Sequence, residues 1–437
     1  MAEKMKPSGI DWIGDIPNNW ETSRIKYHYQ ISLGKMLQPI QENSTDTLEH
    51  YMCSANITWA GVDTSILKQM WFSPAEKKQY RLLDGDLLVS EGGDVAVSCI
   101  WRNELDECYL QNAVHRVRQN ALSDNRFIYY WLFFLKNYGI VDLVCNKATI
   151  AHFTKEKFGE LPICIMSIDE QVAIADFLDK ECGQIDSVAA DLEKQIALLQ
   201  QYKKSLITET VTKGLDKSVP MKDSGVEWIG EIPDHWQKTR IKFESSIIGS
   251  GTTPDSGNSM YYDNGEHSWI QSGDLYGKDY IYETEKQLTN LAILECRALN
   301  WYTKDFVVVA MYGASVGNVA ISKIDSFTNQ ACCVIKINEE NDNRYLFYFL
   351  KAAQEEMLLK AFGGTQPNIS QVIIKNLNFL NVPLSEQIEI SDFLDSKCDM
   401  IDKMLQSKKD QYDILIKHKK SLIYEYVTGK KRVKEAQ

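Results

Sequence analysis

The chain has 437 residues, which is more than one hydrophobic core usually serves, so we expect two or more domains. Hydrophobic residues make up 44% of it and charged residues 25%, a composition that excludes a disordered chain. The formal net charge of -12 excludes a uniformly basic surface, so any nucleic-acid role depends on local basic patches or on a partner that supplies positive charge.

The first residues and the cysteines indicate the compartment. Residues 1–11 mix Glu3, Lys4 and Lys6 without an apolar core, and we find no apolar run of the roughly 18 residues that a membrane span needs. The ten cysteines are scattered through a large chain without a secretion signal, a pattern typical of reduced thiols. We therefore expect a cytoplasmic protein.

The chain is a tandem duplication. Residues 5–26 and 221–242 are identical at 13 of 22 positions, and residues 170–186 recur at 386–402 with the same offset of 216. Between these segments the two halves diverge. A shared scaffold with unlike inserts predicts two similar bodies that present different surfaces, although a duplication that simply drifted would look the same.

Each half predicts a mixed α and β head. The runs DGDLLVSEGGDVAVSCIW from Asp84 and KDFVVVAMYGASVGNVAI from Lys304 both place two β-rich stretches around a glycine turn, which predicts hairpins or bulged strands. Aromatic helical stretches follow at 127–135 and 345–350. Polar loops come next at 146–154 and 362–370, and such matched polar loops are the expected contact surface.

Two long helices are predicted, one after each head. From Ile168 to about Thr212 there is no proline and no glycine except Gly183, and each helix of roughly 40 residues would span on the order of 60 Å. Because a lone helix cannot bury an apolar stripe, we predict that the two pair antiparallel as a coiled coil. The stripe residues are Ile185, Val188, Leu192, Ile196, Leu199, Tyr202 and Leu206 in the first helix and Ile401, Met404, Leu405, Leu415 and Leu422 in the second.

Two sets of side chains have competing interpretations. Lys203, Lys204, Lys419 and Lys420 are interpreted as a solvated face, the alternative being a surface for phosphate or an acidic partner. The tryptophans that recur in register are interpreted as core residues rather than as platforms for base stacking. They are Trp12, Trp20, Trp228 and Trp236.

Four motifs in the second half resemble those of the DNA specificity subunits of type I restriction-modification systems. They are SGVEWIGEIPDHW at 224–236, GSGTTP at 249–254, GGTQPNIS at 363–370 and EQIEISDFLD at 386–395. The resemblance extends over nearly the whole chain. The first half departs from it, because SLGKMLQP at 32–39 replaces the GSGTTP loop and NKATIAHFT at 146–154 replaces GGTQPNIS.

The resemblance implies an α+β fold with an internal pseudo-two-fold repeat. Two mixed α/β target-recognition domains, at 1–165 and 219–381, would each read one half of a split DNA site. The spacer helices at 166–218 and 382–437 would fix the unread gap between the halves. The implied partners are double-stranded DNA, two methyltransferase subunits and an ATP-driven restriction subunit, with S-adenosylmethionine, ATP and Mg on those partners and no cofactor on this chain.

The chain lacks the motifs that catalysis of these reactions needs. An adenine-methylating site would carry Asn-Pro-Pro-aromatic, but Pro-Pro occurs nowhere, and no G-x-x-x-x-G-K-[ST] loop is present for ATP. None of the seven histidines lies at metal-ligand spacing from a cysteine pair, so no zinc site is predicted. We expect a non-catalytic subunit, the alternative being a coiled-coil scaffold that binds proteins and no DNA.

Base edges are read by polar side chains, which the matched loops supply. Each of the candidates also has a structural interpretation, such as capping a helix or bracing a loop. The candidate DNA-binding residues are Lys35, Gln38, Lys147, Thr149 and His152 in the first head and Ser250, Thr252, Thr253, Gln271, Ser272, Asn318, Thr365, Gln366 and Asn368 in the second.

Overall fold

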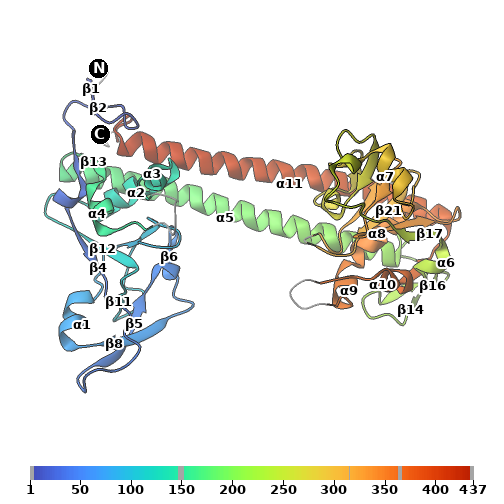
Figure 1. Cartoon of the computed structure of the whole chain (residues 1–437). Helices are drawn as coiled ribbons and strands as arrows, with labels where there is room; N and C mark the ends of the chain where they lie inside the picture. Colours follow the sequence, from blue (N-terminus) through green and yellow to red (C-terminus); the bar gives the residue numbers. More distant parts are fainter. Residues whose placement is uncertain (1–3, 146–151, 314, 363–366, 434–437) are drawn as a thin grey trace. The chain divides into compact units, whose positions relative to one another are not determined.

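The computed structural model describes residues 4–145, 152–313, 315–362 and 367–433 (Figure 1). The chain divides into two compact units. Unit 1 is Met1–Glu193 with Asp410–Gln437, and unit 2 is Lys194–Lys409. Each unit contains one mixed α/β head and part of both long helices.

The long helices are α5 (Ile168–Lys213) and α11 (Leu384–Val427), as the sequence predicts. Their less exposed residues recur with a seven-residue period, which is the pattern of a coiled-coil seam. Three predicted stripe residues lie outside this seam: Val188 and Tyr202 of α5, and Met404 of α11, which is 47% exposed. Val188 and Tyr202 are 49% and 56% exposed, whereas Ala189 is buried and the Lys203 side chain is only 17% exposed.

The two helices run antiparallel in each unit. In unit 1, contacts move forward along α5 and backward along α11, from the rings of Phe177 and Tyr426 (4.3 Å between centroids) to the ion pair of Asp186 with Lys419. In unit 2, Lys203 forms an ion pair with Asp402. Further along α5, Ile207 and Val211 share a core with Leu394 and Ile390, which lie progressively earlier in α11. The predicted antiparallel pairing is confirmed, but Lys203 and Lys419 lie in the seam and the solvated interpretation was wrong for them.

The head of unit 1 is built on a four-stranded antiparallel sheet in the order β10-β9-β12-β4, packed against helix α2. A second sheet has three strands in the order β11-β5-β8, and all three come between β4 and β12 in the sequence. The strands are β1 (Met5–Pro7), β2 (Asp15–Pro17), β3 (Glu21–Arg24), β4 (Tyr29–Leu33), β5 (Thr47–Met52), β6 (Ile57–Thr58), β7 (Gly61–Val62), β8 (Lys68–Phe72), β9 (Leu87–Ser90), β10 (Ser98–Ile100), β11 (Tyr109–Leu110), β12 (Val114–Gln119) and β13 (Pro162–Ile165), and the helices are α1 (Pro74–Tyr80), α2 (Asn125–Asn137), α3 (Ile140–Val144) and α4 (Lys155–Glu160).

The head of unit 2 repeats this plan with a five-stranded sheet, β17-β24-β21-β22-β19, and a three-stranded sheet, β20-β18-β23. Helix α8 packs against the larger sheet as α2 does in unit 1. The strands are β14 (Met221–Asp223), β15 (Glu231–Pro233), β16 (Gln237–Arg240), β17 (Ser245–Ser250), β18 (His267–Ile270), β19 (Tyr280–Ile281), β20 (Gln287–Leu288), β21 (Phe306–Ala310), β22 (Val319–Ser322), β23 (Phe327–Thr328), β24 (Cys332–Ile337) and β25 (Asn378–Asn381), and the helices are α6 (Ile241–Glu244), α7 (Asn290–Glu295), α8 (Asn343–Ala352), α9 (Gln354–Leu359) and α10 (Gln371–Asn376).

The predicted hairpins and aromatic helices are confirmed. Strands β9 and β10 pair antiparallel, as do β21 and β22, and each pair encloses the glycine-containing turn. Helices α2 and α8 begin at aspartate N-caps, Asp124 and Asp342, whose carboxylates accept backbone N–H groups that the first helical turn leaves unpaired. The matched caps explain why both aromatic stretches start their helices at equivalent positions.

The end of each long helix packs on the start of a head. Gly214 follows α5 and Gly429 follows α11, both with φ +71°, a left-handed conformation that ends helices and favours glycine. A Cβ on Gly214 would lie 3.2 Å from the Trp236 ring, and one on Gly429 would lie 2.4 Å from Pro17. Trp236 and its repeat equivalent Trp20 are fully buried, and Trp12 and Trp228 are partly buried and pack against the same cores, so the core interpretation of the four tryptophans is confirmed.

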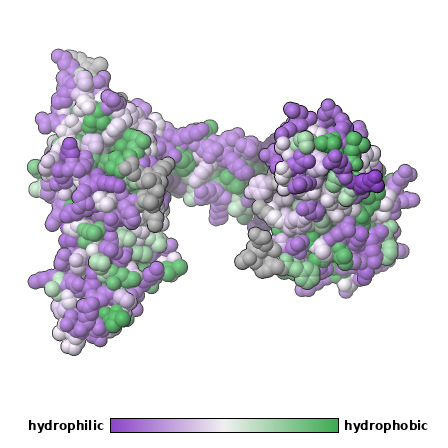
Figure 2. Space-filling model, in the orientation of Figure 1, coloured by the Kyte–Doolittle hydropathy of each residue, from purple (hydrophilic) through white to green (hydrophobic). Residues whose placement is uncertain are grey.

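All ten cysteines are free thiols, eight of them buried. On the face shown in Figure 2, hydrophilic residues cover most of the surface of both heads, and the hydrophobic patches between them are small. None of the helices in the described residues has the length and apolar character needed to cross a bilayer.

Candidate nucleic-acid interface

The main sheet of unit 1 has one end fixed to α5 and one end that carries loops. Strand β12 pairs with β4 from Gln119 opposite Tyr29 at one end to His115 opposite Leu33 at the other. The Tyr29 hydroxyl, at the first end, donates to the backbone oxygen of Asp124 at 3.0 Å. The loop that begins after Leu33 therefore lies at the sheet end away from the attachment to α5.

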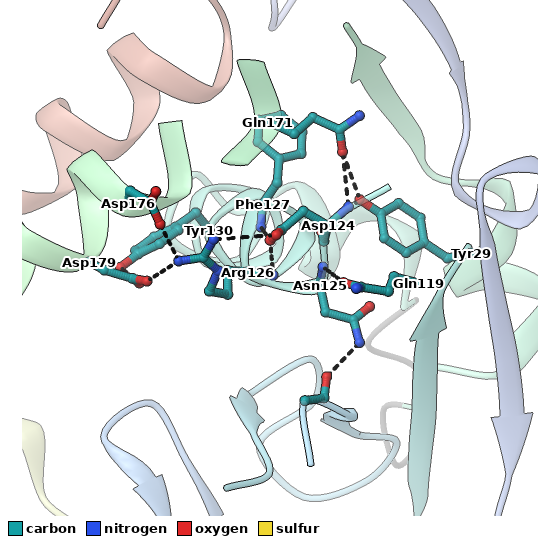
Figure 3. A network of polar contacts seen from close by, with 11 residues as sticks. Tyr29, Gln119, Asp124, Asn125, Arg126, Phe127, Tyr130, Gln171, Asp176 and Asp179 are labelled. Atoms are coloured by element: carbon teal, nitrogen blue, oxygen red, sulfur yellow. Dashed lines mark hydrogen bonds and ion pairs between the residues drawn. The ribbon is translucent and has the colours of Figure 1, made fainter. Parts of the chain in front are cut away.

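The fixed end is held by a buried glutamine of α5 (Figure 3). Gln171 is 2% exposed, and its amide nitrogen donates to the carbonyls of Leu122 and Met166, both at 3.1 Å. Its amide oxygen accepts the backbone N–H of Asp124 at 3.2 Å. Because a buried amide left unpaired is costly, these bonds fix the start of α2 on α5.

An arginine extends this attachment (Figure 3). The Arg126 guanidinium contacts the carboxylates of Asp176 at 2.5 Å and Asp179 at 3.0 Å, both on α5. Burial alone would lower the pKa of Arg126, but its bonds with these aspartates raise it, so the charge is retained. The hydroxyl of Tyr130 also donates to Asp179, at 2.7 Å.

Unit 2 repeats the attachment residue for residue. The fully buried Gln387 of α11 accepts the backbone N–H of Asp342 at 2.9 Å. The Arg344 guanidinium contacts Asp392 at 2.7 Å and Asp395 at 2.8 Å. Both heads are therefore attached at the same end of their main sheet, which leaves the same opposite end for the predicted contact loops.

The GSGTTP loop of unit 2 packs tightly at this opposite end. A Cβ on Gly251 would lie 1.6 Å from the backbone oxygen of Thr328, so only glycine permits this approach. The Thr253 hydroxyl donates to the side chain of Gln330. The Ser250 carbonyl accepts from Tyr302, and the side chains of Ser250, Thr252 and Thr253 are all half-buried at the surface.

The structure brings two further candidates to this loop. The backbone N–H of Asn329, which precedes Gln330, donates to the carbonyl of Ile270 at 2.9 Å. Gln271 directly follows Ile270 and so lies near the loop. Gln271 lines a hollow of about 620 Å³ together with Thr253 and Lys286. Ser272 follows, and its carbonyl accepts the Ser315 hydroxyl at 2.6 Å.

The remaining candidates of unit 2 lie next to this group or outside the described residues. Met311 bonds through its backbone to Ala331 and to Ile369, both at 2.7 Å, which brings the exposed Asn368 to the same sheet end. Asn318 ends the turn after Met311, and its side-chain oxygen lies 3.5 Å from the amide of Gln354. Thr365 and Gln366 fall outside the described residues.

In unit 1 the equivalent loop buries its candidate lysine. Lys35 is 6% exposed, and its ammonium pairs with Glu76 and with Gln38. Burial alone would raise the pKa of Glu76, but Lys35 and the Ser73 hydroxyl and N–H hold it below its usual value. Lys35 is not presented to a ligand here, whereas Gln38 is half-buried and its side chain also donates to the Ile40 carbonyl at 3.3 Å.

His152 is the one described candidate of unit 1 that is exposed at this sheet end. It precedes Phe153, whose backbone N–H donates to Glu91, just as Ile369 in unit 2 donates to Met311. It lines a hollow of about 790 Å³ with Trp59 and other residues. Lys147 and Thr149 fall outside the described residues.

The sequence reasoning missed a matched pair of amide residues beneath these loops. Gln111 and Asn112 in unit 1 correspond to Asn329 and Gln330 in unit 2, and both pairs precede an alanine. The first amide of each pair accepts that alanine's backbone N–H at 3.0 Å. The sequence holds two adjacent amide residues followed by alanine in both halves, and this repeat could have identified the pair.

These surfaces carry side chains that can recognise hydrogen-bonding groups. Among the described candidates, those at the unit 2 sheet end offer hydroxyls and amides and His152 at the unit 1 sheet end offers an imidazole, groups that suit base edges. Among the described residues, no three histidine, cysteine or acidic side chains lie close enough together to hold a metal ion.

Comparison with known proteins identifies relatives over nearly the whole chain. A family model described as "Type I restriction modification DNA specificity domain" matches residues 17–198 and 233–411. The type I restriction enzyme MjaVIII specificity subunit of Methanocaldococcus jannaschii is 24% identical over 434 residues, covering 96% of this chain and 94% of the relative. A second relative from that organism, a specificity subunit designated MjaX, is 23% identical and covers 97% and 96% of the two chains.

A solved structure has the same fold. It is described as "Structural basis underlying complex assembly and conformational transition of the type I R-M system", and its chain superposes with a TM-score of 0.71. The alignment covers 94% of this chain and 98% of that chain at 13% sequence identity. At this identity the likeness supports the two-headed α+β fold and no particular contact.

Proposed function

The chain belongs to the type I restriction-modification DNA specificity family, a non-catalytic family, and on that premise we propose that it reads a two-part DNA sequence, one part with each unit. In this proposal the chain directs partner subunits to the sequence, where they methylate adenine or cut the DNA.

One observation carries the proposal. In both units the main sheet is attached to a long helix at one end by an arginine and a buried glutamine, and the loops at the other end differ between the units. A constant attachment with variable loops is what reading two different half-sites requires. In unit 2 those loops present Thr253, Gln271 and Asn368, whose side chains can bond base edges.

The acidic charge of the chain fits a division of labour among subunits. Phosphate contacts supply most of the affinity for DNA, whereas base contacts supply specificity. With a net charge of -12, this chain would carry specificity while methyltransferase subunits neutralise the phosphates. S-adenosylmethionine, ATP and Mg would bind to the methyltransferase and restriction subunits.

The long helices would set the gap between the two half-sites. Helix α5 has 46 residues, and at 1.5 Å per residue it is about 70 Å long. A seam of heptad contacts keeps such a helix pair stiff and in one register. The number of unread base pairs would then follow from helix length.

Selection from a random DNA pool tests the proposal. The chain would be assayed by electrophoretic retardation, alone and co-purified with a methyltransferase subunit from the same system, and the retained DNA sequenced. We expect enrichment of two short blocks at a fixed separation. Enrichment of no sequence by the folded complex would contradict the proposal and favour a scaffold that binds only proteins.

A further inference from the structure

The loop after β4 in unit 1 carries three exposed apolar side chains. Met36 is 75% exposed, Leu37 56% and Ile40 74%. A single exposed apolar residue is ordinary on a protein surface, but here three lie within five positions of one short loop. The sequence-based expectation for this loop was the reverse, since it placed Lys35 and Gln38 at the surface.

The loop is anchored on both sides of Met36 and Leu37. The Lys35 backbone bonds to Leu110 at 2.9 Å and to Asn112 at 2.8 Å, and the Gln38 carbonyl accepts from Trp71 at 3.0 Å. A buried lysine is costly unless it is paired, and Lys35 is paired with Glu76 and Gln38 beneath the loop. Because the backbone is hydrogen-bonded at residues 35 and 38, the exposed Met36 and Leu37 lie on a backbone that is already fixed.

The repeat places this projection on the surface proposed to face DNA. A Cβ on Gly34 would lie 2.6 Å from the Leu110 carbonyl oxygen, and one on Gly251 would lie 1.6 Å from the oxygen of its equivalent Thr328, so both loops start with a close approach to the same backbone position. Met36 follows Gly34 as Thr253 follows Gly251. It therefore occupies in unit 1 the place from which Thr253 lines the hollow with Gln271 in unit 2.

We propose that Met36 and Leu37 read the 5-methyl group of thymine in the half-site bound by unit 1, an inference that rests on the proposed function. In the major groove thymine is the base that presents an apolar group, whereas the other base edges present donors and acceptors. A thioether or isobutyl side chain against those polar edges would leave them unpaired, which costs binding energy. The anchored backbone reduces the ordering cost of the contact.

Deoxyuridine tests the contact, because it differs from thymidine only by this methyl group. The assembled complex with a methyltransferase would be titrated with its target duplex and with duplexes in which each specified thymine, on either strand, is replaced singly. We expect the dissociation constant to rise about fourfold when one or more thymines of a single half-site are replaced, because one buried methyl group is lost. Replacement in the other half-site serves as the internal comparison.

The double variant Met36→Ala/Leu37→Ala assigns the effect to this loop. It should bind the thymine duplex as weakly as the natural chain binds the uracil duplex, and replacement should then have no further effect. Leu83→Ala is the matched control, since Leu83 is 50% exposed and precedes β9 at the attached end of the sheet, and it should keep the full response.

The outcomes separate this inference from the proposed function. If every thymine replacement is neutral, or the double variant keeps the natural response, the methyl contact is wrong while two-part recognition stands. A half-site for unit 1 made only of G·C pairs would contradict it as well. Binding without any sequence preference would instead contradict the proposed function itself. The deoxyuridine measurement needs no variant, so neutral replacement of every thymine would contradict the inference even if the double variant fails to fold.

Discussion

The Lys419 ammonium lies 2.7 Å from the carboxylate of Asp186 in the α5–α11 seam, and the repeat reproduces this pair at the same distance with Lys203 and Asp402. Both lysines are mostly covered, with side chains 13% and 17% exposed. Each ion pair therefore favours the antiparallel register of α5 and α11 within its own unit.

Removing one seam aspartate should destabilise the unit that contains it. Asp186→Ala leaves a mostly covered ammonium without its partner, and because the aspartate itself is half-exposed we expect a loss of about 1 kcal/mol. Asp402→Ala should behave alike. Denaturant unfolding measures both, with Asp399→Ala as control, since its pair with Lys403 is on the exposed face and should contribute under about 0.5 kcal/mol.

The attachment arginines should not tolerate lysine. Arg126 contacts Asp176 and Asp179 through Nη1 and Asp124 through Nη2, a spread over two nitrogens that a single ammonium cannot reproduce. We expect Arg126→Lys to lower the stability of unit 1 by about 1–2 kcal/mol after allowance for the exposure of these aspartates, and Arg344→Lys to do the same in unit 2. Limited proteolysis would show which unit unfolds locally in each variant. Cleavage confined to the unit that does not carry the substitution would contradict the attachment role of the arginine.

Much of this architecture could be predicted because it is periodic or duplicated. The offset of 216 residues, the long helices and the hairpins all appear as repeated patterns. The attachment network was also present in the sequence, since an arginine in α2 and α8 and the two aspartates of each DFLD segment recur in register. It was missed because charged residues near a helix start are usually solvated.

Side-chain direction could not be predicted where one residue decides it. Lys35 turns inward because Glu76, 41 positions later, supplies a carboxylate beneath the loop, and no local pattern indicates such a partner. Val188 and Tyr202 were assigned to the seam because apolar residues were counted. The structure instead keeps a strict heptad and accepts Lys203 in the seam, since Asp402 neutralises it.

Substitutions of the close-packed Gly34 and Gly251 should weaken binding to different half-sites. An alanine at Gly251 would collide with the Thr328 backbone, and one at Gly34 with that of Gln111, so each loop must shift. We expect Gly251→Ala to weaken binding to one half-site at least tenfold and Gly34→Ala to weaken the other, while both variants stay folded. Binding to half-site variants measures this, and each substitution is the control for the other. Equal loss at both half-sites would contradict separate reading.

The buried His115 should make unit 1 sensitive to acid. Burial lowers its pKa below the usual value near 6.5, although the Phe153 carbonyl, 2.7 Å from Nε2, partly offsets this. Below about pH 6.5 the unfolded chain takes up a proton that the folded unit does not, so the stability that is complete above this pH falls as the pH decreases. His115→Gln should reduce the loss measured by thermal unfolding between about pH 7.5 and 5.5. An unchanged loss would show that other groups cause it.

The spacer proposal predicts the effect of lengthening both helices together. One heptad inserted after Glu193 and one after Lys409 would keep the seam in phase and add about 10 Å, or about three base pairs of DNA. The recognised half-sites should stay the same while the gap between them grows. Altered half-site bases with an unchanged gap would contradict the ruler role of the helices.

The most direct test of two-headed reading is single-molecule sequencing of methylated adenines in DNA from cells that express this chain with the methyltransferase subunit of its system. The proposal predicts a split motif, with two short specified blocks around a fixed run of unspecified bases, that disappears when this chain is removed. Methylation by a folded complex at adenines with no common motif, or at one continuous motif that does not depend on this chain, would contradict it.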